Sequence, residues 1–222
     1  MARLTQEGEI FVLDLGGGEN RYSPEVVREI GDAFAEVAAT PGPRALVTTA
    51  TGKIWSNGLD LDWLLPRPEQ AREYILSVQE LFIRLLTLPC PAVAAVQGHA
   101  FGAGAMHVLA HDYRVMRADR GFFCLPEADI GMPFTYGMGE LIQAKLDAQE
   151  AHVAMTTAHR YGGEEAAAVG IVDAAVPEDQ VLTWAMEKAA RLAAKSNDTV
   201  RVIKQRMYAH VIEQLGMLNP GL

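Results

Sequence analysis

The chain has 222 residues, of which 50% are hydrophobic and 21% charged, and its formal charge at pH 7 is −9. This composition predicts one ordinary globular domain, and the acidic balance without a basic tract argues against nucleic-acid binding. The two cysteines, Cys90 and Cys124, lack metal-ligand spacing and are expected to be core residues in a reducing compartment. The charged N-terminal stretch is not a signal peptide, and no apolar run has membrane-spanning length. We therefore expect a soluble, cytoplasmic protein with no membrane partner.

Strand-like and helical apolar patterns alternate along most of the chain, which is typical of α/β proteins. Ser23 and Pro24 form a helix start signal, because a serine hydroxyl caps the first turn and proline suits the first helical position. In chain order the patterns predict a strand at 9–15, a helix at 24–38, a strand at 44–50, a helix at 69–88, a strand at 91–98, a helix near 103–111, and strands at 112–118 and 121–125.

From about Met138 onwards the apolar patterns are mostly helical. These helices have no sheet of their own to cover, so we expect them to pack on the core or on another subunit. No linker divides the chain, and we expect a single domain over 1–222, with a core of about 1–140 and a helical region of about 141–222. The predicted helices of this region are 139–155, 162–170, 181–196 and 198–215.

Two segments of small residues follow predicted strands: "IWSNGLDL" at 54–61 and "GHAFGAGAM" at 98–106. Small residues let a backbone approach a ligand closely, and two N–H groups converging from such loops could form an oxyanion hole. Tight turns whose glycines serve packing alone are the alternative. Neither segment matches a nucleotide-binding loop, because both lack GxGxxG and GxxxxGK[ST].

Glu127 lies in the otherwise apolar stretch at 121–133. A buried acid is costly unless it is paired or has a chemical task. One interpretation is an ion pair with Arg117 or Arg120 at an interface, and the other is a general base that works without a second acid. The residues alone leave both interpretations open.

His107 and His111 share one face of a predicted helix, but no HExxH motif or acidic third ligand accompanies them. We interpret them as satisfied core or surface histidines and expect no metal. Ser56 lacks a GxSxG elbow and a neighbouring base, which argues against a serine nucleophile.

The order and spacing of three segments resemble the crotonase superfamily, the enoyl-CoA hydratase/isomerase fold. They are "IWSNGLDL" at 54–61, the block from "PAVAAVQGHAFGAGAM" to "LPEADIGM" at 91–132, and "RYGGEEAAAVGIVDAAVP" at 160–177. The similarity is closest to Δ3,Δ2-enoyl-CoA isomerases. It implies an α/β spiral of ββα units with a helical C-terminal part used for trimerisation, in homotrimers or dimers of trimers. It also implies an acyl-CoA thioester substrate and no separate cofactor.

In this family two backbone N–H groups hold the thioester carbonyl, and the corresponding residues here are Leu59 and Ala103. Hydratases carry two glutamates, whereas the corresponding positions here hold Met106 and Glu127. A single acid/base suits proton transfer between two carbons better than addition of water. The resemblance therefore implies that Glu127 moves the double bond of a 3-enoyl-CoA to give the conjugated 2-enoyl-CoA, a reaction of fatty acid metabolism and β-oxidation.

The resemblance also suggests further contacts and leaves several questions open. Another crotonase activity, such as hydratase, decarboxylase or acyl-CoA hydrolase, stays possible with Glu127 or Glu140 in a different role, as does a non-catalytic acyl-CoA-binding protein. Whether Glu140 assists Glu127 is also open. Acyl chain length, a fatty or aromatic acyl group, and trimer against hexamer are also open. The candidate CoA phosphate contacts are Arg21, Lys53 and Lys204. The candidate substrate contacts are Ser56, Asn57, Gly58, Trp63, Phe101, Gly102, Met132 and Phe134.

Overall fold

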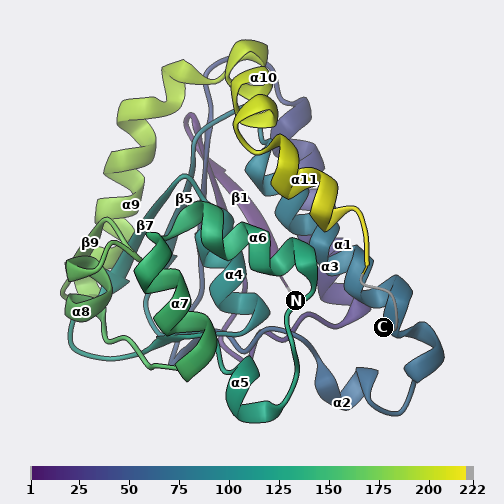
Figure 1. The fold of residues 1–222 in the computed structure, drawn as a ribbon. Coiled ribbons are helices and arrows are strands. Elements are labelled where there is room, and N and C mark those ends of the chain that lie inside the picture. Colours follow the sequence, from purple (N-terminus) through teal and green to yellow (C-terminus); the bar gives the residue numbers. More distant parts are fainter. Residues whose placement is uncertain (1, 219–222) are drawn as a thin grey trace.

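The larger of two β-sheets has six strands in the order β1-β2-β3-β5-β7-β9. The computed structural model describes residues 2–218 (Figure 1). Strands β1 and β2 are antiparallel, and every other neighbouring pair in this sheet is parallel. The strands are β1 (Arg3–Glu7), β2 (Ile10–Asp14), β3 (Ala45–Thr49), β5 (Ala92–Val96), β7 (Tyr113–Arg117) and β9 (Ala174–Val176).

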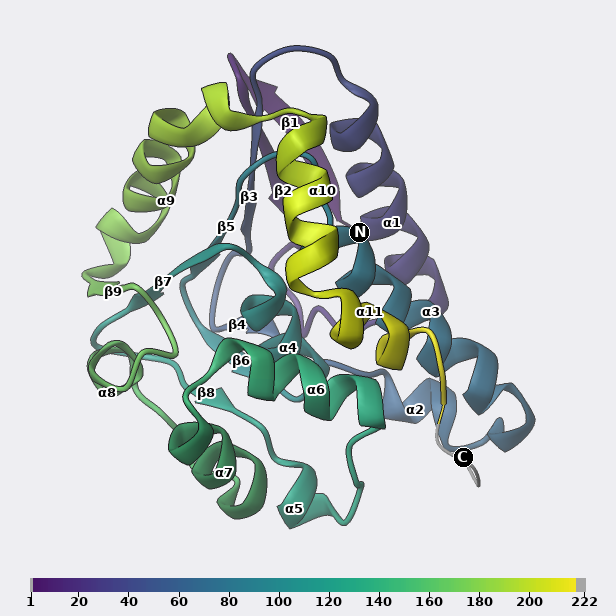
Figure 2. The same cartoon turned by 45° about the horizontal axis from the view of Figure 1, so that its top comes forward.

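Helices cover both faces of this sheet, and accordingly the central strand β5 is apolar and buried at every position. Helix α9 (Glu178–Leu192) packs on one face, and α1 (Pro24–Ala39) and α3 (Ala71–Leu86) lie on the other (Figure 2). Helix α1 begins as predicted, because the Ser23 hydroxyl accepts a hydrogen bond from the Val26 N–H. Helix α3 is preceded by a 3-10 turn, η1 (Pro68–Gln70).

The smaller sheet is parallel and has the strand order β4-β6-β8. Its strands are β4 (Ile54–Ser56), β6 (His99–Phe101) and β8 (Phe123–Cys124). Each follows a strand of the large sheet in the chain and leads into a helix: α2 (Leu61–Leu64), α4 (Ala103–Ala110) or α5 (Glu127–Ile130). This repeat of two strands and a helix confirms the expected α/β spiral.

The last third of the chain packs back onto this core. Helix α11 (Ala209–Leu215) lies against α6 (Tyr136–Lys145) and α3, as Figure 1 shows. The predicted helix 139–155 is in fact two helices. Helix α6 ends at Lys145, and α7 (Ala148–Thr157) begins after the two non-helical residues Leu146 and Asp147. The stretch expected to be helical also contains β9, which pairs with β7. The remaining elements are α8 (Gly163–Ala168), η2 (Ala193–Lys195) and α10 (Asp198–Met207). Within residues 2–218, no helix has the length and apolar character needed to cross a membrane.

Candidate active site

The three strands of the small sheet end at one edge and bring together three residues predicted to act together. Leu59 follows β4, Ala103 follows β6, and Glu127 follows β8. Because carboxyl ends of parallel strands are common ligand-binding positions, this edge is the natural place for a site. A cavity of about 120 Å³ lies there. Its lining is mainly apolar and consists of Asn57, Leu59, Leu61, Ile75, Gly102, Ala103, Pro126, Glu127, Ile130, Met132, Pro133, Phe134, Thr135 and Met138.

Gly58 holds the first two loops in contact. Its φ is +74°, and a Cβ there would lie 2.7 Å from both the Ala103 nitrogen and the Phe101 oxygen. Only glycine permits both this conformation and this approach. Gly58 therefore acts on the site through the packing of the loops, and the substrate contact predicted for it is replaced by this role.

Ser56 is completely buried and holds the first loop from behind. Its Oγ donates to the Asn20 carbonyl at 2.8 Å and accepts from the Gly58 N–H at 3.1 Å. It does not line the cavity. The prediction that Ser56 contacts substrate is thus corrected to a role in shaping the loop.

Two backbone N–H groups are available at this edge. In the described part of the chain, neither the Leu59 N–H nor the Ala103 N–H donates to a protein acceptor. Ala103 is the first residue of α4, so the positive end of that helix dipole points toward the cavity. Gly102, with a φ of +53°, makes the turn that exposes this end. The pair forms the kind of donor set that stabilises a negatively charged oxygen.

Glu127 is the acid of this cavity. A Cβ on Gly102 would lie 3.3 Å from Oε1, while the buried Oε2 has no hydrogen-bond partner among residues 2–218. Burial raises the pKa of Glu127 from 4.5 to about 7. A carboxyl with a pKa near neutrality is suited to both taking and returning a proton.

Neither arginine considered as an ion-pair partner reaches Glu127. Arg117 pairs with Asp119 at 2.7 Å and with Glu178 at 2.7 Å. Arg120 is exposed and lies outside the lining of the cavity. Within the described part of this chain, therefore, neither arginine forms an ion pair with Glu127.

No second acid lines the cavity among the described residues. Met106 is buried in the core at the position where hydratases of the resembling family have a glutamate. Glu140 lies on α6, and its carboxylate is 3.6 Å from the His210 Nε2 rather than in the cavity. Glu127 is thus placed to act without a carboxylate partner.

The other predicted substrate contacts divide between two places. Asn57, Gly102, Met132 and Phe134 line the cavity, where a substrate contact stays a prediction. Phe101 lies in a wider cleft outside it. Trp63 does not reach either space: its ring packs 5.1 Å from that of Tyr74 and borders a separate groove between α1 and α3. The acyl contact predicted for Trp63 is corrected accordingly.

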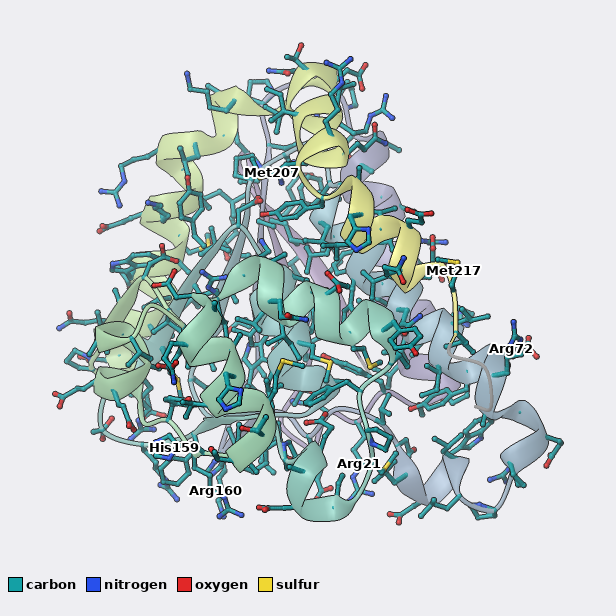
Figure 3. All side chains as sticks on the ribbon, viewed as in Figure 1. Arg21, Arg72, His159, Arg160, Met207 and Met217 are labelled. Carbon is teal, nitrogen blue, oxygen red and sulfur yellow. The ribbon has the colours of Figure 1, made fainter. Side chains whose placement is uncertain are left out.

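The outer cleft, of about 570 Å³, adjoins the cavity, and its lining contains the cationic residues Arg21, Lys53 and Arg160 together with the acidic residue Asp62. The predicted Arg21 and Lys53 line it, and Arg21 is held by Glu19 and Asp62. His99 and Arg160 also line it, although the sequence reasoning did not find them. Figure 3 shows Arg21 and Arg160 on the side of the molecule that carries α5.

Burial and nearby positive charges both act on the His99 imidazole in this cleft. Burial first, and then the charges of Lys53, Arg120 and Arg160, lower the pKa of that imidazole. Lys53 and Arg160 thus supply positive charge here although the whole chain has a formal charge of −9, while Arg21 is paired with Glu19 and Asp62. Such a cleft suits an anionic ligand.

Lys204 is not in this cleft. Its ammonium group is 2.6 Å from Asp112 and donates to the Cys90 carbonyl at 2.9 Å, and the residue is only 8% exposed. A buried lysine with both partners in place is part of the core. The predicted phosphate contact is therefore corrected to a structural ion pair.

The two helical histidines are core residues. His107 Nδ1 lies 2.7 Å from the Tyr22 hydroxyl, and His111 Nε2 lies 2.8 Å from Thr48 Oγ1. Burial lowers the pKa of His107 to about 3 and that of His111 well below its usual value, so both are neutral. In the part of the chain that the structure describes, no three His, Cys, Asp or Glu side chains are grouped as metal ligands.

The fold and this site define a protein of the crotonase class. The family described as enoyl-CoA hydratase/isomerase matches residues 10–217, and the chain belongs to this family.

Its relatives carry the names of isomerases and hydratases. A peroxisomal enoyl-CoA delta isomerase 2 of Arabidopsis thaliana is 33% identical over 98% of this chain and 96% of its own length. A putative enoyl-CoA hydratase of Thermus thermophilus is 30% identical over 92% of this chain and 82% of its own. The apo structure of an enoyl-CoA isomerase of Mycobacterium tuberculosis superposes with a TM-score of 0.86, at 26% identity, covering 96% and 93% of the two chains.

Proposed function

We propose that this protein is an enoyl-CoA isomerase that converts a 3-enoyl-CoA into the conjugated 2-enoyl-CoA. The observation that carries the proposal is the solitary carboxyl of the half-buried Glu127, which lines one cavity together with Leu59 and Ala103, the residues whose backbone N–H groups are available. The curated Arabidopsis relative named an isomerase, similar over almost its full length, supports the same activity.

The proposed reaction uses one residue as both base and acid. The ionised Glu127 removes a proton from C2, the electrons of that C–H bond form a C1–C2 double bond, and the electrons of the carbonyl double bond move onto the thioester oxygen. The N–H groups of Leu59 and Ala103 donate to the resulting dienolate oxygen. Glu127 then gives its proton to C4, so the C3–C4 double bond is lost and C2–C3 becomes the double bond. Removal of a single donor of this kind costs about 2.7–4 kcal/mol in transition-state stabilisation.

Hydration is the competing activity, since the Thermus relative is named a putative hydratase. Adding water requires a group that positions and deprotonates the water as well as one that protonates carbon. Met106 offers no such group, and Glu140 points to His210.

The substrate's CoA portion is assigned to the outer cleft. Arg21, Lys53, His99 and Arg160 supply cationic or hydrogen-bonding groups there, which suits the phosphates of CoA. No separate cofactor is needed for the proton transfer. We further propose a homotrimer or a dimer of trimers in the cytoplasm, although the Arabidopsis relative is named peroxisomal.

One assay separates the candidate functions. The purified protein is given a 3-enoyl-CoA and, separately, a 2-enoyl-CoA, and the absorbance of the conjugated thioester is followed. An isomerase makes the absorbance rise with the first substrate. A fall with the second substrate alone would identify a hydratase and contradict the proposal, and no change in either would identify a binding protein.

A further inference from the structure

We propose that the cavity at Glu127 accepts only short acyl chains, of about six carbons or fewer, and that Met138 sets this limit. The inference rests on the proposed function, since it assumes that the acyl group of a CoA thioester occupies the cavity. The inference concerns the length of the acyl group, and an isomerase reaction by itself sets no such length.

The cavity has a distinguishable mouth and inner end. Asn57, Leu59, Leu61, Pro126 and Ile130 line both the cavity and the outer cleft, so they form the mouth. Ile75, Thr135 and Met138 line the cavity alone and are buried, so they form its inner end.

The inner end is closed by hydrogen bonds behind the lining. Thr135 Oγ1 donates to Gln79 Oε1 at 2.5 Å, and both residues are buried. Gln79 Nε2 in turn donates to the carbonyls of Leu215 at 2.5 Å and Met217 at 3.2 Å. These bonds connect α3 to the start of α6 and to the end of α11. The polar groups of Thr135 and Gln79 at the inner end of the cavity are therefore satisfied by each other and by these carbonyls.

The contact between α6 and α11 leaves no room behind this wall. A Cβ on Gly137 would lie 2.5 Å from the Leu215 Cα, so the two backbones touch. Only a change in a lining side chain can therefore lengthen the cavity without separating helices.

The volume of the cavity limits the number of acyl carbons that fit in it. A dry cavity of about 150 Å³ holds one benzene molecule, that is, about six carbons. The cavity here is about 120 Å³ and includes the reacting end beside Glu127 and Ala103. Since C1 to C4 must lie between these residues, room remains for about two further carbons.

Met138 is the residue whose side chain can change this volume most directly. Met138 belongs to the first turn of α6, whose N-cap is Thr135. The Met138 N–H donates a hydrogen bond to the Thr135 hydroxyl at 3.1 Å. A methionine is unbranched and fills irregular space, and its replacement by alanine keeps the helix favourable while removing most of the side chain.

The test is a binding ladder with saturated acyl-CoA esters of four, six, eight and twelve carbons, measured by calorimetry on wild type, Met138→Ala and Met155→Ala. Met155 is the matched control, because it packs against α6 beside Gly139 and does not line the cavity. Wild type is expected to bind the six-carbon ester best and the twelve-carbon ester at least about 10-fold more weakly. Met138→Ala is expected to bind the eight-carbon ester at least about 10-fold more tightly than wild type, and Met155→Ala to match wild type.

Tight binding of the twelve-carbon ester by wild type would overturn the inference, as would an equal shift in both variants. Because the ladder requires no turnover, it is independent of the reaction. A length limit without isomerase activity would refute the proposed function alone, and isomerisation of every length with equal efficiency would refute the length limit alone.

Discussion

Replacing Glu127 with glutamine is expected to remove activity and, at the same time, to stabilise the fold above neutral pH. Glutamine has nearly the same shape but cannot take up or release a proton. The loss of general acid/base catalysis should lower kcat by roughly 10²–10⁴-fold. The gain in stability follows from the burial of the wild-type carboxylate.

The direction of the stability change comes from the raised pKa. Glu127 has a pKa of about 7 in the folded protein and an ordinary value of 4.5, so between these values the folded protein keeps a proton that the unfolded chain has lost. The unfolding free energy of wild type therefore falls as the pH rises from about 4.5 to about 7, and this contribution is constant above that range. The glutamine variant lacks this contribution.

The size of the effect is set by the same values. The interval from 4.5 to about 7 corresponds to about 3 kcal/mol, at about 1.4 kcal/mol per pH unit. Because the carboxyl is only partly shielded from the cleft, we expect about 2 kcal/mol to be measured. Relative to wild type, the variant should therefore gain about 2 kcal/mol between about pH 5 and about pH 8.

Urea unfolding of both proteins at about pH 5 and about pH 8, at one protein concentration, measures this difference. The reasoning requires the two midpoints to separate with rising pH. A difference between variant and wild type that is the same at both pH values would refute it, since the buried carboxyl would then titrate as it does in water.

Three further perturbations test the site and its surroundings. With a pKa of about 7 for Glu127, kcat/KM should rise about tenfold per pH unit up to about pH 6.5 and level off above about pH 8; a flat profile would contradict the role of that carboxylate as base. Gly58→Ala should lower kcat by about 10²-fold, because its Cβ would force the two loops apart, whereas Gly18→Ala, with no atom within 4 Å of its Cβ, should match wild type in the same assay. Lys204→Met should cost about 2–4 kcal/mol of unfolding free energy and leave CoA affinity unchanged in a titration; weakened CoA binding without a loss of stability would restore the phosphate contact.

The long elements could be predicted from sequence because each has a period or a cap that depends on local residues alone. Helix α1 has its serine cap and proline, β5 is a continuous apolar run, and β3 begins with three apolar residues followed by two β-branched threonines. Strand β1 was missed, since its exposed, mostly polar residues show no apolar alternation. The strands β4 and β6 have three residues each, which is too short for a period to be recognised.

The grouping of Glu127, Leu59 and Ala103 could be predicted from the family resemblance but not from local patterns. Their proximity depends on three short parallel strands that end at one edge. Arg160 was missed for a related reason. It is brought to the outer cleft by a bridge between Phe123 and Tyr161, a pairing over a long sequence separation that no local pattern encodes.

The predictions that needed correction share a cause. A lysine, tryptophan or serine is compatible with a ligand contact, but tertiary structure decides which partner it finds. Lys204 lies beside Asp112, and the ring of Trp63 packs against Tyr74. Residue type indicates what a side chain can do, whereas the packing of distant segments determines what it contacts.

The central claim is that one shielded carboxyl moves a hydrogen from C2 to C4. The direct measurement uses a 3-hexenoyl-CoA carrying deuterium at C2, converted in ordinary water, with the isotope in the product located by NMR. We predict that a measurable share of the deuterium is found at C4. A product whose C4 has received hydrogen from the solvent alone would contradict the claim.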